Sequence, residues 1–175
     1  MSNIPIQSKN DEAPMEKEFR IKGLMMDPAS NSPIVLLQEN EGTTIIPIWV
    51  GVFEANAIAL QIERIDSPRP MTHDLMKHFL LHMGARIERV VVTKLEENTF
   101  YAIIEIENDG QSTTIDCRPS DALALAIRMD APIFVTSQVI KNSQSLSFDR
   151  SELDPKDVRE WLSKLNPDEL GKYEM

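Results

Sequence analysis

Two short segments gather most of the side chains that could do chemistry. The first runs from Arg69 to Asp74 and reads Arg-Pro-Met-Thr-His-Asp, and the second runs from Asp116 to Asp121 and reads Asp-Cys-Arg-Pro-Ser-Asp. Each combines a guanidinium, a hydroxyl and at least one carboxylate with a proline that can open a helix. Unpaired N–H groups at a helix start, beside an arginine, can hold an anionic phosphate.

The first segment has both a structural and a functional interpretation. Thr72 can cap the helix that follows, and Asp74 in the first turn is favoured by the helix dipole by about 0.3–1 kcal/mol. His73 beside Asp74 at a helix start can instead serve as an acid, a base or a metal ligand. The functional interpretation makes His73 and Asp74 catalytic and gives Arg69 to the substrate.

The second segment also supports two interpretations. In the structural one, Ser120 or Asp121 is the cap, Pro119 starts the helix, and Arg118 pairs with Asp116 or Asp121. In the functional one, Asp116 and Asp121 hold a divalent cation, Mg²⁺ or Mn²⁺, that activates water, while Arg118 and Ser120 contact the substrate.

Glu54 is a third candidate, and Cys117 is not one. Glu54 follows Gly51 in the first turn of a predicted helix, where an acid suits the dipole; it would line the same cleft if the chain is duplicated. Cys117 is the only cysteine, which rules out an intrachain disulfide, and no neighbouring histidine in the sequence marks it as a nucleophile.

The elements that must position these residues follow from hydrophobic periodicity. Short apolar or alternating runs bounded by turn residues predict strands over 19–26, 33–38, 43–49, 85–95, 99–107, 112–117 and 132–136. Helical spacing predicts helices over 51–65, 71–82 and 122–129. In the second helix we expect Leu75, Met76, Phe79 and Leu80 to face inward.

This order predicts an α+β fold with a mixed, largely antiparallel sheet. Three strands followed by an Ala/Leu-rich helix occur twice, with Ala57 and Ala122 at corresponding places, so we predict a duplicated β-β-β-α unit. Residues 1–18 are polar and predict a flexible arm before a domain spanning 19–140. Residues 141–175 form an extension whose helix carries Trp161 on an apolar face, available to its own domain or to a partner.

Composition limits the function classes. The 175 residues carry 18 Lys and Arg against 28 Asp and Glu, a formal charge of −10, whereas proteins that hold nucleic acid by phosphate contacts usually present a basic face. The single cysteine suits a reducing compartment, and the first residues lack a secretory signal. No run of about 20 apolar residues occurs. We therefore expect a cytoplasmic protein without a membrane partner.

Several motifs in order resemble a known family. They are Ile-Pro-Ile-Trp-Val-Gly (46–51) with Glu-Ala-Asn-Ala-Ile-Ala-Leu (54–60), the Arg69–Asp74 segment, Thr-Phe-Tyr-Ala (99–102), and the Asp116–Asp121 segment with Ala-Leu-Ala-Leu (122–125). From about Phe19 to Val139 the chain resembles the bifunctional nuclease domain family. The resemblance implies a mixed α+β domain and activity on DNA and RNA. It also implies that the functional residues are Arg69, His73, Asp74, Asp116, Arg118, Ser120 and Asp121, with Glu54 in a supporting role.

Two function classes remain open at this point. The leading hypothesis is a nuclease that cleaves DNA and RNA with little sequence preference and depends on Mg²⁺ or Mn²⁺. The alternative is a non-catalytic binding or regulatory module that engages a protein or a small anionic ligand. We also expect a homo-oligomer, with a dimer as the favoured state, because an antiparallel sheet of this size must cover its edges.

Overall fold

A single eight-stranded sheet organises the molecule. The computed structural model describes residues 15–28, 30–143 and 146–147. The strands are β1 (Glu16–Met26), β2 (Pro33–Glu39), β3 (Thr44–Trp49), β4 (Arg86–Glu96), β5 (Thr99–Asn108), β6 (Gln111–Cys117), β7 (Ile133–Thr136) and β8 (Leu146–Ser147), in the spatial order β6-β5-β4-β7-β1-β2-β3-β8. All neighbours are antiparallel except β4 and β7, so the predicted α+β class and mixed sheet are confirmed.

The sheet contains two meanders joined by one strand. β1-β2-β3 leads into helix α1 (Val52–Ile62), β4-β5-β6 leads into helix α3 (Pro119–Met129), and β7 lies between β1 and β4. The two-residue turns of the second meander have positive φ at Glu97, Asn98, Asp109 and Gly110, as tight hairpins require. The β-β-β-α arrangement predicted from the sequence therefore occurs twice.

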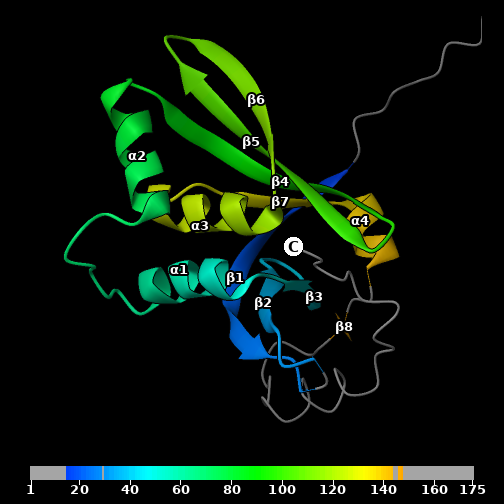
Figure 1. Ribbon diagram of the computed structural model, residues 1–175. Helices are drawn as coiled ribbons and strands as arrows, with labels where there is room; N and C mark the ends of the chain where they lie inside the picture. Colours follow the sequence, from blue (N-terminus) through cyan, green and yellow to red (C-terminus); the bar gives the residue numbers. More distant parts are fainter. Residues whose placement is uncertain (1–14, 29, 144–145, 148–175) are drawn as a thin grey trace, which may run out of the picture.

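Helix α3 forms the centre of the helical layer. Alanine and leucine alternate along it, and every residue from Ala122 to Ala126 is buried. It packs against α1 on one side and against α2 (Thr72–His82) on the other, while the short helix α4 (Ser137–Asn142) lies near β4 and β7 (Figure 1). Small side chains allow this close approach, so the starts of α1, α2 and α3 come near one another.

Helix α2 differs from the sequence prediction. Leu75, Met76 and Phe79 were expected to face inward, but they are 48%, 39% and 59% exposed, and His73 is the only buried residue of the helix. The reason is that α2 crosses α3 steeply at one end of the layer, beside the projecting β5 and β6 strands (Figure 1). No further element of the described chain covers the outer side of α2.

The first strand begins earlier than the sequence predicted. Strand β1 begins at Glu16, where it pairs with Thr136, so Glu16 to Glu18 belong to the sheet rather than to the predicted arm over 1–18. The helix predicted around Trp161 lies outside the described residues. None of the helices in the described ranges is long and apolar enough to span a bilayer.

Candidate active site

The three main helices place an acidic residue at the same position of their first turn. Glu54, Asp74 and Asp121 are each the third residue of α1, α2 and α3, respectively. An acid at this position suits the positive end of the helix dipole, and Asp74 also accepts a hydrogen bond from the Met71 N–H at 3.0 Å. The helix dipole thus explains why a carboxylate occupies this position in each helix, and the packing of the helices determines which side chains each carboxylate contacts.

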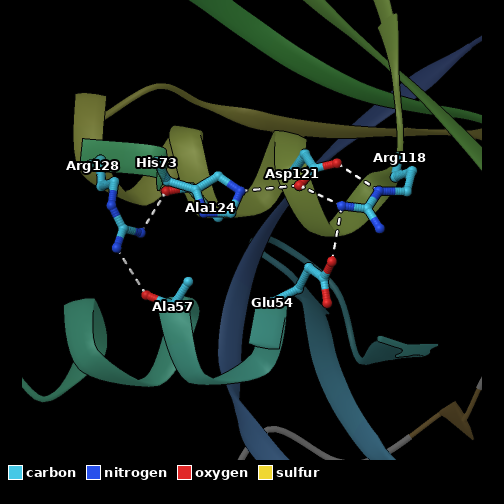
Figure 2. Close-up of polar contacts among 7 residues, drawn as sticks. All are labelled: Glu54, Ala57, His73, Arg118, Asp121, Ala124 and Arg128. Atoms are coloured by element: carbon cyan, nitrogen blue, oxygen red, sulfur yellow. Dashed lines mark hydrogen bonds and ion pairs between the residues drawn. The ribbon is translucent and has the colours of Figure 1, made fainter. Parts of the chain in front are cut away.

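Four side chains from these helix starts form one network (Figure 2). His73 Nε2 lies 3.0 Å from Asp121 Oδ1, which joins the start of α2 to the start of α3. Arg118 donates from Nε to Asp121 Oδ2 at 2.7 Å and from Nη2 to Asp121 Oδ1 at 3.1 Å. The same Nη2 lies 2.9 Å from Glu54 Oε1 on α1. Glu54 and Asp121, which are 67 positions apart in the sequence, therefore both contact the guanidinium of Arg118.

The network fixes the charge of Asp121. Burial favours the neutral form of this carboxyl, but the hydrogen bonds from His73 and Arg118 outweigh burial and hold the pKa of Asp121 below its ordinary value. Asp121 is therefore an anion at neutral pH and a weak proton acceptor. His73 is buried behind it, whereas the Arg118 side chain is 48% exposed and is the member of the network most open to solvent.

The network lies at the rim of an open hollow between α2 and β6, which we call the α2–β6 hollow. Its volume is about 580 Å³, within the range of ligand sites. The walls are apolar and come from four elements: Met76, Phe79 and Leu80 of α2, Ile104 and Ile106 of β5, Ile115 of β6 and Leu125 of α3. The polar residues His73, Asp116, Arg118 and Asp121 line the same hollow. A guanidinium therefore faces a space that can hold an apolar group.

Asp74 serves a different part of the molecule from its neighbour His73. It accepts a hydrogen bond from Arg128 Nε at 2.7 Å and lines a second hollow of about 340 Å³ between α1 and α2. Burial raises the pKa of Asp74, and the hydrogen bonds from Arg128 and from the Met71 N–H lower it by more. Asp74 therefore lies apart from His73 and Asp121, because consecutive residues at a helix start point to different sides, and its predicted catalytic role stays a prediction.

Arg128 is the residue that the sequence prediction missed. Its side chain is only 3% exposed, and it donates to Asp74. It also donates to the Ala124 carbonyl at 2.9 Å and to the Ala57 carbonyl at 3.0 Å (Figure 2). One guanidinium thus fastens α1, α2 and α3 together. The available signal was a lone arginine in the otherwise apolar helix that follows Asp121.

Comparison with known proteins decides the family. Residues 35–147 match the model of the bifunctional nuclease domain. The chain belongs to the bifunctional nuclease domain family. It is 33% identical over 162 residues to a Mycobacterium tuberculosis (strain H37Rv) protein named "Uncharacterized protein Rv1829", covering 87% of this chain and 97% of that protein.

Two plant relatives carry the family name. The chain is 26% identical over 122 residues to "Bifunctional nuclease 1" of Oryza sativa subsp. indica and 28% identical over 116 residues to "Bifunctional nuclease 1" of Arabidopsis thaliana. These alignments cover 37% and 36% of the plant proteins. The bifunctional nuclease domain in this chain therefore corresponds to about a third of each plant protein.

Of the other predicted residues of the bifunctional nuclease domain, two lie at the network or its hollow and two do not. Asp116 is exposed on β6 and lines the α2–β6 hollow, and Glu54 reaches the network through Arg118. Arg69 is exposed and lines neither hollow, so it lies apart from the network. Ser120 is 1% exposed and its hydroxyl is buried, so the predicted contact of Ser120 with substrate is not available in this arrangement.

The thiol of Cys117 is not activated. Burial, together with the nearby Asp121 and Asp116 carboxylates, raises its pKa to about 11. A thiol with this pKa is almost fully protonated at neutral pH and is a poor nucleophile. This agrees with the sequence argument that Cys117 is not catalytic.

The carboxylates do not form a ready metal site. Both oxygens of Asp121 already accept hydrogen bonds from Arg118, and Oδ1 also meets His73. A cation at Asp121 would stand against the Arg118 guanidinium, which repels it. Within the described residues, no three side chains of His, Cys, Asp or Glu are gathered as a metal centre needs. The predicted dependence on Mg²⁺ or Mn²⁺ stays a prediction for an assay.

Proposed function

We propose that this chain is a nuclease that hydrolyses phosphodiester bonds of DNA and RNA with little sequence preference, and that the α2–β6 hollow is its active site. The observation that carries the proposal is the convergence of His73, Arg118 and Asp121 at one accessible rim in a member of the bifunctional nuclease domain family. The names of the plant relatives support the same activity.

In this proposal each residue has one task. Arg118 binds the phosphate, because a guanidinium matches phosphate oxygens in charge and geometry. Asp121 and Glu54 hold the guanidinium in place, and His73 fixes the orientation of Asp121; these three are positioning residues. Asp116, the exposed carboxylate of the same hollow, takes the proton of the water that attacks phosphorus. The P–O bond to the leaving nucleoside then breaks, and its oxygen is protonated by solvent.

The charges predict how such a nuclease binds its substrate. Glu54 and Asp121 both contact the guanidinium of Arg118, and the carboxylate of Asp116 lines the same hollow, so long-range attraction of nucleic acid is weak. Each phosphate neutralised contributes a salt slope of about −0.7 to −0.9 in log K. We expect the logarithm of kcat/KM to fall with the logarithm of salt concentration with a slope near −1, whereas a steep slope would place binding on another, basic surface.

The decisive experiment is a cleavage assay with single-stranded DNA and RNA in EDTA, Mg²⁺ and Mn²⁺. Wild type, Asp121→Asn and Asp130→Asn are purified side by side; Asp130 is exposed and lies at the other end of α3, so its variant controls for the loss of one negative charge. Cleavage by wild type and Asp130→Asn, and its loss in Asp121→Asn, support the proposal. Absence of cleavage by wild type under every condition would end it.

The alternative is a non-catalytic binding module, and one observation favours it. The carboxylates of the network are engaged by Arg118 and His73, and the hollow beside them is largely apolar. Such a site suits a small anionic ligand with an apolar body, whose acid group would meet Arg118. Saturable binding of such a ligand by protein that cleaves no nucleic acid would establish this function instead.

A further inference from the structure

Strands β2 and β3 are buried on both faces of the sheet. Val35 of β2 lies opposite Ile48 of β3, and both belong to the core that α1 and α3 share with the sheet. The residues next to them point away from that core, because side chains alternate between the two faces of a strand. We call this other side the outer β2–β3 face; its members are Ile34, Leu36, Ile45, Pro47 and Trp49.

The outer β2–β3 face is apolar and shielded from water. Ile34 and Ile45 are 0% exposed, and Leu36 is 8% exposed. The helices of the described chain do not supply this cover: α1, α3 and α4 place their buried residues in the core on the other side of the sheet, and α2 packs on α3. The turn after β1 reaches one end of the face, where Asp27 accepts a hydrogen bond from Trp49. The rest of the cover must come from residues outside 15–28, 30–143 and 146–147.

Two stretches are long enough to cover this face, 1–14 and 148–175, and they start from different places. Strand β8 pairs with β3 so that Leu146 lies opposite Ile45, and residues 148–175 therefore begin at the border of the outer face. Residues 1–14 precede Met15, whose carbonyl accepts a hydrogen bond from the Ser137 N–H directly after β7. Because β7 lies on the opposite side of β1 from β2, the C-terminal stretch is the better placed of the two.

Residues 148–175 also have a suitable pattern and charge. Four apolar residues recur at helical spacing after Pro155, and we call them the C-terminal stripe: Val158, Trp161, Leu162 and Leu165. A helix over residues 155–165 is about 16 Å long and the seven-residue strand β2 about 23 Å, so one helix can lie along the face.

Charge favours this stretch over a second copy of the chain. Residues 148–175 carry eight Asp and Glu against five Lys and Arg. Arg20 of β1 lies at the border of the outer face, beside Gln38, and makes no ion pair with another described residue. An acidic stretch can supply its partner. A second copy would instead bring a formal charge of −10 against a chain of the same charge.

We propose that residues 148–175 fold back over the outer β2–β3 face and pack the C-terminal stripe against it. The match to the bifunctional nuclease domain ends at residue 147, so the extension beyond that domain completes the burial of its sheet. Strand β3 leads through Gly51 into α1, which carries Glu54, so the extension also supports the strand from which α1 starts. This packing is independent of the proposed nuclease activity.

Disulfide trapping in the full chain tests this packing directly. In a Cys117→Ser background, a cysteine at position 36 is combined in turn with a cysteine at 158, 161, 162 or 165, and at least one pair should form an intrachain disulfide on oxidation of dilute protein. Val35→Cys is the matched control: Val35 faces the core, so none of its four pairs should form. Disulfides that link two chains would show that a second copy covers the face, and the absence of any disulfide with position 36 would exclude residues 148–175.

Urea denaturation of the full chain gives an independent test. Trp161→Asp should lower the equilibrium constant for folding at least 100-fold, because it removes a large apolar side chain from the contact and puts a charge there. Phe53→Asp is the control, since Phe53 on α1 is 81% exposed, and it should change the constant less than about threefold. Circular dichroism without urea shows that each variant is folded. Equal effects of the two variants, or no effect of Trp161→Asp, would overturn the proposal.

Discussion

Replacing Arg128 by methionine tests how the three helices are held together. The guanidinium of Arg128 contacts α1 through Ala57, α2 through Asp74 and its own helix through Ala124. Methionine retains the apolar stem and removes all three hydrogen bonds. We expect Arg128→Met to lower the free energy of unfolding while leaving the secondary structure in place.

The magnitude follows from what each partner loses. The two carbonyls lie inside helices and keep their ordinary backbone hydrogen bonds, so their loss is small. Asp74 loses a charged partner, but its side chain is 29% exposed and water replaces part of the interaction. A charged hydrogen bond contributes about 1.5–3 kcal/mol to stability, so we expect Arg128→Met to lower the free energy of unfolding by about 2–4 kcal/mol in total. For a chain of this size that corresponds to a Tm lower by roughly 5–15 °C.

Urea denaturation monitored by circular dichroism at several pH values measures this loss. Because Arg128 lowers the pKa of Asp74, the pair stabilises the folded state above the ordinary carboxyl pKa of 3.8, and this contribution disappears as pH falls through the lower, folded-state pKa. The difference between wild type and Arg128→Met should therefore shrink below about pH 4.

Arg118→Met provides the matched control for this measurement. Arg118 also pairs with an aspartate and is bound to the same helix, but its side chain is 48% exposed, so we expect its variant to lose less than about 1 kcal/mol. The reasoning would be refuted if Arg128→Met lowered the free energy of unfolding by less than about 0.5 kcal/mol, or if Arg118→Met lowered it more than Arg128→Met does.

Two further predictions concern residues outside the network. Cys117, with a pKa of about 11, should react with iodoacetamide at pH 7.5 far more slowly than an unhindered cysteine, and faster as pH rises above 9; rapid labelling at pH 7.5 would contradict its burial. Asp27, which is 2% exposed, accepts from Trp49 Nε1 at 3.2 Å and from Ser30, so Asp27→Ala should cost about 1–3 kcal/mol and shift the fluorescence of Trp49 in a Trp161→Phe background. Unchanged stability and emission would show that the Trp49 indole does not depend on Asp27.

Much of the fold followed from local patterns. Strand alternation, hairpin turns such as Asn108-Asp109-Gly110, and the two Ala/Leu helices predicted the two meanders and their order, because these signals depend on residues close together in the sequence. The approach of the helix starts was also expected, and the contact between His73 and Asp121 confirms it.

What failed depends on contacts between distant segments. Periodicity identified the apolar side of α2, but whether Phe79 is covered depends on whether another element packs there. The helix start implies that His73 and Asp74 point to different sides, but the sequence could not show which of them meets Asp121, since this depends on how α3 and Arg128, 54 positions beyond Asp74, pack against α2. Ser120 was grouped with its polar neighbours although packing of α3 buries it.

The rate of nucleic acid cleavage by Asp121→Asn, compared with Asp74→Asn, tests the central claim most directly. Both aspartates are the third residue of a helix and both pair with an arginine, but only Asp121 lines the α2–β6 hollow. We predict that Asp121→Asn lowers kcat/KM at least about 100-fold and that Asp74→Asn changes it less than about threefold while lowering stability. Equal loss of activity in both variants, or full activity in Asp121→Asn, would contradict the account.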